Sequence, residues 1–171
     1  LDGRGADRMV RPLLAALERD GGRALPMTES LLARISGKDN PQMVLGAFEQ
    51  RWQDPGRIAP DAGRCWIALD RVRDPGNLGT IMRTADATGA RGIILIGDCT
   101  DPYSVEAVRA SMGAVFNVEL AQMPEDDFLD LAAGWPGQIV GTALPASRDY
   151  RKVDYAGPLI LLMGNEQAGL T

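Results

Sequence analysis

Five short apolar runs dominate the later part of the chain: CWIAL, GIILIG, VFNVEL, QIVGTAL and PLILLMG. Segments of helix length separate the first four runs, and this alternation predicts parallel strands connected by helices. Parallel sheets are covered on both faces, which fits strands that read as nearly continuous hydrophobic runs. The region from Arg64 onward is therefore predicted to be an α/β domain, with helices on both faces of a parallel sheet.

One helix of this region has a recognisable start. Asp101 and Pro102 have the residue types of an N-cap and a first helical turn. The apolar residues that follow at helical spacing are expected to form its buried stripe, and they are Val105, Val108 and Met112. VFNVEL, the next apolar run, is predicted to be a strand throughout.

The first part of the chain has a different pattern. A leucine stripe predicts a helix that ends near Gly21, Thr28 is expected to cap a second helix, and residues 43–48 read as a strand. A stretch with three clusters of Pro and Gly and no apolar periodicity then marks a boundary. The predicted organisation is part of a small N-terminal α/β domain over residues 1–51, a linker over 52–63 and the main domain over 64–171.

Composition excludes several classes of protein. The 171 residues are 45% hydrophobic and 24% charged, as in ordinary globular domains. No stretch approaches the roughly 20 apolar residues of a membrane span, and the first residues lack a secretory layout. We therefore expect a cytoplasmic protein without a membrane partner.

The chain has no His and only two Cys, which restricts its chemistry. Cys65 and Cys99 form no CxxC pair, so we expect them to be packing residues and predict no metal site. Without imidazole, catalysis must use carboxylates, Arg, Lys, amides, hydroxyls or a cofactor.

The loop RVRDPGNLG, which follows the first predicted strand of the sheet, is the first candidate site. The net charge of −5 argues against a broad basic surface for nucleic acid, yet Arg71, Arg73 and Arg83 gather positive charge here. The fingerprints of dinucleotide-binding and P-loop proteins are absent from it. A tight strand-to-helix turn built from residues 74–77 is the alternative interpretation, without any function.

The loop MGNEQAGLT, which follows the most hydrophobic strand, is the second candidate. Glycines on both sides of Asn165 and Glu166 would let a ligand approach the backbone closely at the lip of a buried strand. The alternative is a solvent-facing glutamate in a glycine-rich turn.

Together, DPGNLGTIMRTADATGA and LLMGNEQAGL resemble the first and second motifs of the SpoU/TrmH family of RNA ribose methyltransferases. VRASMGAVFNV resembles the Ser-Met-Gly segment between them, so the resemblance covers essentially all of residues 64–171. TESLLARISGKDNPQMVLGAF is similar to the end of the small substrate-binding domain that many members carry. The resemblance implies a parallel sheet whose C-terminal end is tied in a deep trefoil knot, and a homodimer.

The resemblance also implies a reaction and its residues. A methyl group of S-adenosylmethionine would pass to a ribose 2′-hydroxyl of structured RNA, either ribosomal or transfer RNA. Asn77, Arg83 and Glu166 would be the active-site residues. Contacts to the cofactor would come from Thr142, Ala143, Leu144, Met163, Gly164 and Asn165, and contacts to RNA from Arg71, Arg73 and Ser111. A guanidinium has no lone pair with which to accept a proton, so we expect Arg83 to clamp a phosphate or stabilise the alkoxide rather than act as a base.

The family's third motif, which contains Ser-Leu-Asn and closes the knot, does not occur before Thr171. We therefore expect the natural protein to continue beyond this residue. Two other functions stay open at this point: a noncatalytic RNA-binding relative, and an unrelated α/β protein that binds a metabolite.

Overall fold

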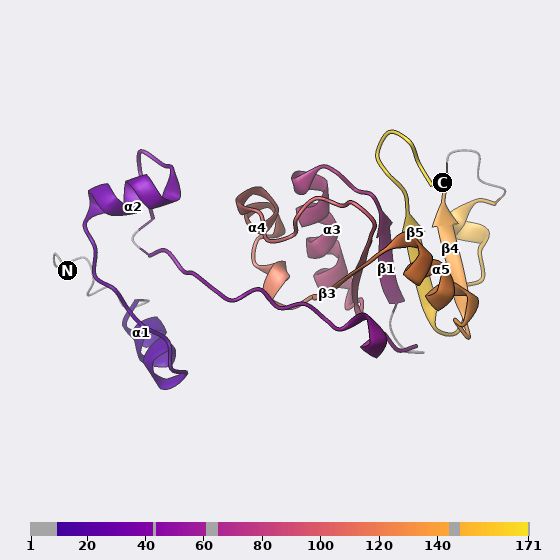
Figure 1. Cartoon of the computed structure of the whole chain (residues 1–171), viewed down its shortest axis with the longest axis horizontal. Helices are drawn as coiled ribbons and strands as arrows, with labels where there is room; N and C mark the ends of the chain where they lie inside the picture. The colour runs from indigo at the N-terminus through magenta and orange to yellow at the C-terminus, as the bar shows by residue number, and fades with distance from the viewer. Residues whose placement is uncertain (1–9, 43, 61–64, 144–147, 171) are drawn as a thin grey trace. The chain divides into compact units, whose positions relative to one another are not determined.

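The computed structural model describes residues 10–42, 44–60, 65–143 and 148–170. The chain forms two compact units, Leu1–Glu49 and Gln50–Thr171. Figure 1 shows the helices of the first unit in indigo and the sheet of the second unit in magenta to yellow.

The first unit contains two helices, α1 (Val10–Arg19) and α2 (Glu29–Ser36). The Thr28 side chain accepts a hydrogen bond from the backbone of α2, and Gly37 ends this helix in the left-handed conformation, as predicted. The strand predicted over residues 43–48 does not form in its described part, 44–48, and Met43 lies outside the described residues. A strand needs a pairing partner, and the described part of this unit contains no other strand.

Residues 50–60, most of which the sequence suggested as a linker, belong to the second unit. The backbone N–H of Gln53 donates to the carbonyl of Leu120 at 2.7 Å. Ile58 is buried, and the indole N–H of Trp66 donates to the carbonyl of Ala59 at 3.1 Å. A short 3-10 turn, η2 (Pro55–Arg57), lies between these contacts. The segment looked like a linker because it is rich in Pro and Gly. Its buried residue, Ile58, is a single apolar position and gives no periodic pattern.

The second unit is a five-stranded parallel sheet with helices, in agreement with the predicted fold class. Its elements in chain order are β1 (Cys65–Asp70), α3 (Pro75–Thr88), β2 (Gly92–Ile96), α4 (Val105–Ser111), η3 (Ala114–Phe116), β3 (Glu119–Met123), α5 (Glu125–Ala133), β4 (Gln138–Thr142), η4 (Tyr150–Lys152) and β5 (Leu159–Met163).

The strand order is β3-β2-β1-β5-β4. The chain moves from β1 towards one edge of the sheet, crosses to the other edge for β4 and returns to place β5 beside β1. The order therefore reverses between β1 and β5, and ligands of open α/β sheets bind beyond the carboxyl ends of the strands at such a point.

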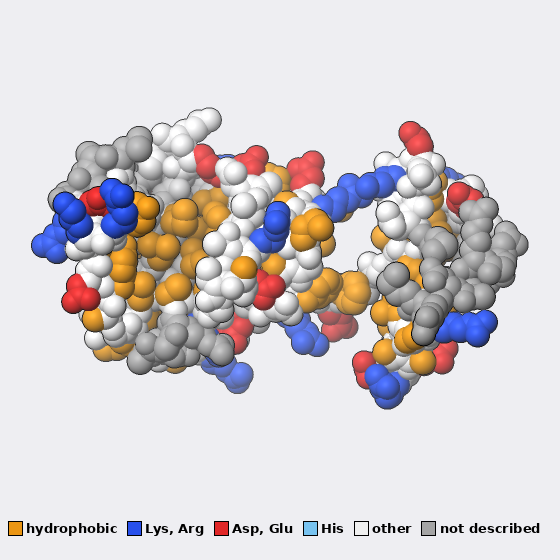
Figure 2. Space-filling model, turned by 180° about the vertical axis from the view of Figure 1, so that it is seen from behind, with side chains coloured by type: hydrophobic (Ala, Val, Ile, Leu, Met, Phe, Trp, Pro, Cys, Tyr) orange, Lys and Arg blue, Asp and Glu red, His pale blue; other side chains and the backbone are white. Residues whose placement is uncertain are grey.

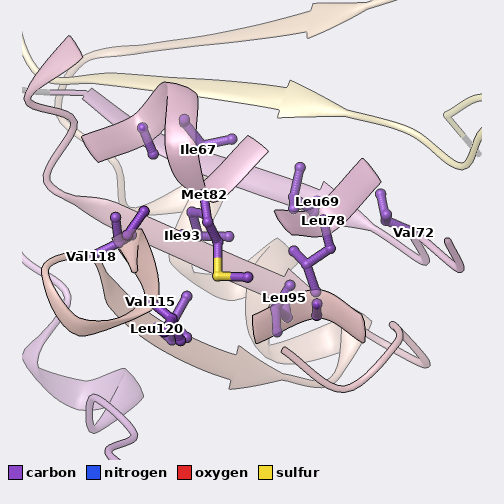
Figure 3. Packing of buried hydrophobic residues seen from close by; sticks show 13 residues of the cluster. Ile67, Leu69, Val72, Leu78, Met82, Ile93, Leu95, Val115, Val118 and Leu120 are labelled. Carbon is purple, nitrogen blue, oxygen red and sulfur yellow. The ribbon is translucent and has the colours of Figure 1, made fainter. Parts of the chain in front are cut away.

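Helices cover both faces of the sheet, as predicted. On one face, Leu78 and Met82 of α3 pack against Ile67 of β1 and Ile93 and Leu95 of β2, as Figure 3 shows. On the opposite face, the alternate residues of the same strands form a second cluster with α5, which includes Trp66, Ile94, Phe128, Trp135 and Ile160. Both clusters follow from the side-chain alternation of strands.

Two predictions for the region after β2 are wrong in part. Helix α4 begins later than predicted, because Ser104 and not Asp101 accepts the capping hydrogen bond. Val105 and Met112 consequently lie 63% and 79% exposed, and Ala107 and Ser111 are the buried residues. The run VFNVEL is likewise not one strand, because its first residues form η3 and β3 begins only at Glu119.

Strand β5 is less buried than expected for a strand that is covered on both faces. Ile160 is fully buried, whereas the other four residues of the strand are half-buried. Leu161 pairs in register with Val140 of β4, and neither residue belongs to the two core clusters. Figure 2 shows hydrophobic side chains gathered on the sheet unit, towards the left of the view. This arrangement leaves apolar surface at the β4 edge of the sheet among the residues that the structure describes.

Candidate active site

The loop after β1 has an unusual backbone conformation. Arg71 adopts a φ of 53°, a left-handed conformation that residues other than glycine rarely adopt. Its guanidinium donates to both carboxylate oxygens of Asp70, at 2.7 and 3.0 Å, and its backbone N–H donates to Ile96 at 3.1 Å. Strained residues persist where their surroundings determine them, and they gather at functional sites.

Helix α3 begins immediately after this loop. Asp74 is its N-cap and accepts a hydrogen bond from the backbone N–H of Asn77 at 2.6 Å, while Pro75 occupies the first turn. The alternative interpretation of the sequence was a tight strand-to-helix turn over residues 74–77. These residues form the N-cap and the first turn of α3. Asn77 is therefore held in regular helix at the carboxyl edge of the sheet.

The loop after β5 folds back on itself. Asn165 and Gly169 exchange two backbone hydrogen bonds of 3.0 and 2.9 Å. The side-chain oxygen of Asn165 accepts from the backbone of Gln167 and Ala168, and its amide donates to the carbonyl of Arg71 at 2.7 Å. Asn165, in the loop after β5, thus holds the backbone of Arg71, the left-handed residue in the loop after β1.

Glu166 connects the two loops. Its carboxylate accepts hydrogen bonds from the backbone N–H groups of Arg73 and Asp74 and from the side-chain amide of Asn77, each at 3.3 Å. The side-chain amide of Asn165 is a fourth, longer donor at 3.5 Å. A carboxylate offers about four acceptor positions, so these four donors match its capacity. We call this arrangement the Glu166 latch.

The pKa of Glu166 follows from these contacts. Desolvation raises the pKa of this carboxyl, but the hydrogen bonds from the backbone and from Asn77 outweigh it, so the pKa lies below the ordinary value for glutamate. Glu166 is therefore ionised near neutral pH. A charged acceptor already engaged by four donors suits an organising role better than proton abstraction.

A hollow of about 360 Å³ lies between the two loops. It is lined by Arg73, Asp74, Asn77, Asn165, Glu166 and Gln167. All six come from the segments that follow β1 and β5, the two strands at which the strand order reverses. The structure thus brings together Asn77 and Glu166, two of the three predicted active-site residues.

Arg83, the third predicted residue, does not line this hollow. It follows Asn77 on α3 by about one and two-thirds turns, which places it on a different side of the helix. Its side chain is exposed, and no ion pair joins it to any residue that the structure describes. The guanidinium is therefore accessible to an external anion.

The three residues predicted to contact RNA differ in their availability. The guanidinium of Arg71 is engaged by Asp70, and that of Arg73 forms a 2.7 Å ion pair with Asp98 while remaining largely exposed. Ser111 is fully buried, and its hydroxyl donates to the carbonyl of Val108 at 2.7 Å. This position gives no support to direct contact between Ser111 and RNA.

The residues predicted to hold a cofactor lie at the carboxyl ends of two paired strands. Thr142 of β4 pairs in register with Met163 of β5, and Ala143, Gly164 and Asn165 follow directly. Leu144, the remaining residue of this set, lies outside the described residues. Thr142 and Ala143 are exposed, so their backbone groups are open to a ligand.

Sequence reasoning missed Asp74 and Asp98. Asp74 carries the recognisable Asp-Pro signature of a helix start, so its capping role could have been found. No motif marks Asp98 in the sequence, because its contact with the site is an ion pair with Arg73 in another loop.

Within the described ranges, no helix is long and apolar enough to cross a membrane, and no group of three or more Cys, Asp or Glu side chains could hold a metal ion.

Comparisons with known proteins agree with this geometry. Residues 64–171 match the model of the SpoU rRNA methylase family. The 23S rRNA (uridine(2479)-2′-O)-methyltransferase of Streptomyces viridochromogenes is 33% identical over 175 residues, which cover 98% of this chain and 60% of the relative. A crystal structure of an AdoMet-bound rRNA methyltransferase from Sinorhizobium meliloti aligns with a TM-score of 0.90 and 50% identity, over 95% of this chain and 63% of that one.

A third comparison is the SpoU methyltransferase AviRb from Streptomyces viridochromogenes in complex with AdoMet. It aligns with a TM-score of 0.78 and 31% identity, over 96% of this chain and 64% of that one. The chain therefore spans less than two thirds of the length of each of these three relatives.

Proposed function

Because the chain belongs to the SpoU rRNA methylase family, we propose that it is an RNA methyltransferase that uses S-adenosylmethionine to methylate a ribose 2′-hydroxyl. The observation that carries this proposal is the Glu166 latch, which assembles Asn77 and both loops at the reversal of strand order. The relatives support it, since they are named as rRNA 2′-O-methyltransferases or are AdoMet-bound.

The ends of β4 and β5 fit the proposed cofactor. Thr142, Ala143 and Leu144 would hold it from one strand, and Met163, Gly164 and Asn165 from the other. Gly164 has no side chain, which lets the loop after β5 fold back against it, and the half-buried Met163 offers apolar contact. When bound, S-adenosylmethionine supplies an electrophilic methyl group on its sulfonium.

The residues of the chain would position the ribose and stabilise charge. Asn77 uses its amide N–H on Glu166, which leaves the amide oxygen without a partner among the described residues and able to accept from a ribose hydroxyl. Placing the hydroxyl oxygen in line with the methyl group lowers the barrier by proximity and orientation. Glu166 would act on the reaction through Asn77 and the loop.

Arg83 would meet the RNA as a fixed positive charge. A planar guanidinium can hold a phosphate by two parallel hydrogen bonds, or stabilise the oxyanion that develops on the ribose. Its exposure suits either role. We propose structured ribosomal or transfer RNA as the substrate, a homodimer as the assembly and the cytoplasm as the location.

The experiment that tests this function has two stages. Calorimetry should show binding of S-adenosylmethionine and none of NAD, because the sheet lacks a dinucleotide loop. Transfer of a radiolabelled methyl group to 23S rRNA or bulk tRNA should then produce a nucleoside methylated on its ribose. Tight binding of NAD without a response to S-adenosylmethionine would contradict the proposal.

A further inference from the structure

A second hollow of about 250 Å³ lies in the sheet unit, at the carboxyl end of β2 and β3. Leu95 and Gln122, which pair in register, line it from the two strands. The other lining residues are 99–102, Gln50 and Trp52. We propose that this Trp52 pocket binds one unpaired nucleobase of the substrate RNA.

Trp52 is held on a fixed backbone. The hydroxyl of Tyr103 accepts from the backbone N–H of Arg51 at 3.2 Å and donates to the carbonyl of the same residue. On the other side of Trp52, Gln53 is bound to Leu120 at 2.7 Å. Burial raises the pKa of Tyr103, so its hydroxyl keeps the proton that it donates.

The indole of Trp52 is available to a ligand although its position is fixed. It contacts Tyr103 edge-on, with 5.2 Å between the ring centroids and 82° between the planes, yet 41% of Trp52 remains exposed. The other two tryptophans, Trp66 and Trp135, are 1% and 9% exposed. A half-exposed aromatic ring on an ordered backbone loses little entropy when a base stacks on it.

The polar groups of the pocket suit the edge of a base. Gln50 and Trp52 both line the pocket. The amides of Gln50 and Gln122 have no hydrogen-bond partner among the described residues, and each can donate and accept. Asp101 adds a carboxylate, and none of the described lining residues is basic. This lining favours a neutral ring with donors and acceptors over a phosphate.

The Trp52 pocket lies close to the catalytic hollow. The backbone N–H of Thr100 donates to the carbonyl of Val72 at 2.8 Å, which joins the two loops. Arg73 lines the first hollow and forms an ion pair with Asp98. The next residue, Cys99, lines the Trp52 pocket. A base in this pocket would therefore belong to a nucleotide near the methylated one. The inference rests on the proposed function, because it assumes RNA as the ligand.

Tryptophan fluorescence tests the pocket directly. Because Trp66 and Trp135 are buried, stacking of a base should quench Trp52 alone. Short unstructured oligoribonucleotides should quench the emission saturably, and Trp52→Phe should abolish the quenching while retaining RNA affinity through its ring. Trp52→Ala should weaken RNA binding by about 5- to 160-fold, the range expected for the loss of one stacked base.

Matched variants separate this pocket from general effects. Tyr150→Ala removes an aromatic residue that is 73% exposed and lies outside the pocket, so it should leave RNA affinity unchanged. Gln122→Leu should weaken binding and alter the preference among oligomers of different base, because it removes hydrogen bonds and keeps the volume.

The outcomes distinguish the pocket from the enzyme. If S-adenosylmethionine binds and RNA is methylated, but Trp52→Ala neither changes RNA affinity nor KM, the pocket is overturned and the proposed function stands. If the unsubstituted protein binds no S-adenosylmethionine, the proposed function fails, while saturable quenching by RNA still supports the pocket. Quenching by no oligoribonucleotide overturns the pocket in either case.

Discussion

The side-chain amide of Asn77 donates a 3.3 Å hydrogen bond to the carboxylate of Glu166, a residue 89 positions further along the chain. Asn77 lies in the first turn of α3 and Glu166 in the loop after β5, so the contact joins the two sequence motifs across the centre of the sheet. The same carboxylate binds the backbone of Arg73 and Asp74. The geometry of the two loops at this edge therefore depends on Glu166 as an acceptor.

Replacement of this acceptor should loosen the site. Glu166→Gln exchanges a charged acceptor for an amide that can serve fewer of the four donors, so methyl transfer should fall while the fold persists. We expect Tm to fall by about 2–4 °C, the change that roughly 1 kcal/mol produces in a domain of this size. Calorimetric melting and methylation assays measure both effects. Glu106→Gln on α4 is the control, and equal behaviour of the two variants would contradict the latch.

The stabilisation by Glu166 should depend on pH. Its pKa is lower in the folded protein than in the unfolded chain, where glutamate titrates near about 4.3. The contribution is therefore fully present above that value and is lost as the pH falls through the folded pKa. In urea titrations, the stability difference between the unsubstituted protein and Glu166→Gln should shrink between about pH 5 and pH 3. A stability difference that grows as the pH falls would show that the pKa of Glu166 is not lowered by folding.

Arg83→Lys should separate chemistry from folding. Lysine keeps the positive charge but cannot present a planar pair of donors, so methylation should fall by about a hundredfold if Arg83 positions phosphate or oxyanion. Tm and cofactor affinity should stay unchanged, because the side chain is exposed and lies outside the catalytic hollow. Arg57→Lys, an exposed position in η2, is the matched control. Nearly full turnover of Arg83→Lys would remove Arg83 from the mechanism.

Gly164 should not tolerate a side chain. A Cβ atom there would lie 2.2 Å from the carbonyl carbon of Gly169 and 2.4 Å from the backbone nitrogen of Leu170, so the folded loop would have to open. We expect Gly164→Ala to destabilise the protein by about 1–3 kcal/mol and to weaken binding of S-adenosylmethionine. Gly134→Ala places its Cβ 3.8 Å from the carbonyl oxygens of Asp130 and Leu131, an ordinary contact distance, and should have little effect. Denaturant unfolding and calorimetry compare the two, and a stable Gly164→Ala protein with normal cofactor affinity would contradict the crowding.

Much of the sheet could be predicted because its signal is local. Apolar runs at regular intervals identified the positions of all five strands, although η3 takes the first residues of one run. The Asp-Pro pair illustrates the limit of such signals. At residues 74–75 it begins a helix, whereas at 101–102 it forms a turn, because Ser104 offers a cap nearer to the helix. Local sequence does not decide between two adjacent caps.

The site was partly predictable for a related reason. Asn77 and Glu166 were recognised by motif, and the structure brings them together. The roles of Asn165 and Asp98 could not be inferred, since each depends on a partner in another loop whose position is set by strand order. The motif resemblance grouped Arg83 with Asn77, although they lie six positions apart in α3 and helical geometry puts them on different sides of the helix.

The position of β5 between β1 and β4 has a consequence for the order of folding. Strands β1, β2 and β3 pair with neighbours that are close in sequence, whereas β5 pairs with β1 over a separation of more than ninety residues. Contacts at long separation form late, because closing a long loop costs entropy before any pairing compensates it. Glu166 directly follows β5, so the latch can close only when this central strand is inserted. A nascent or partly folded chain can thus possess α3 and its Asn77 and still lack the Glu166 latch.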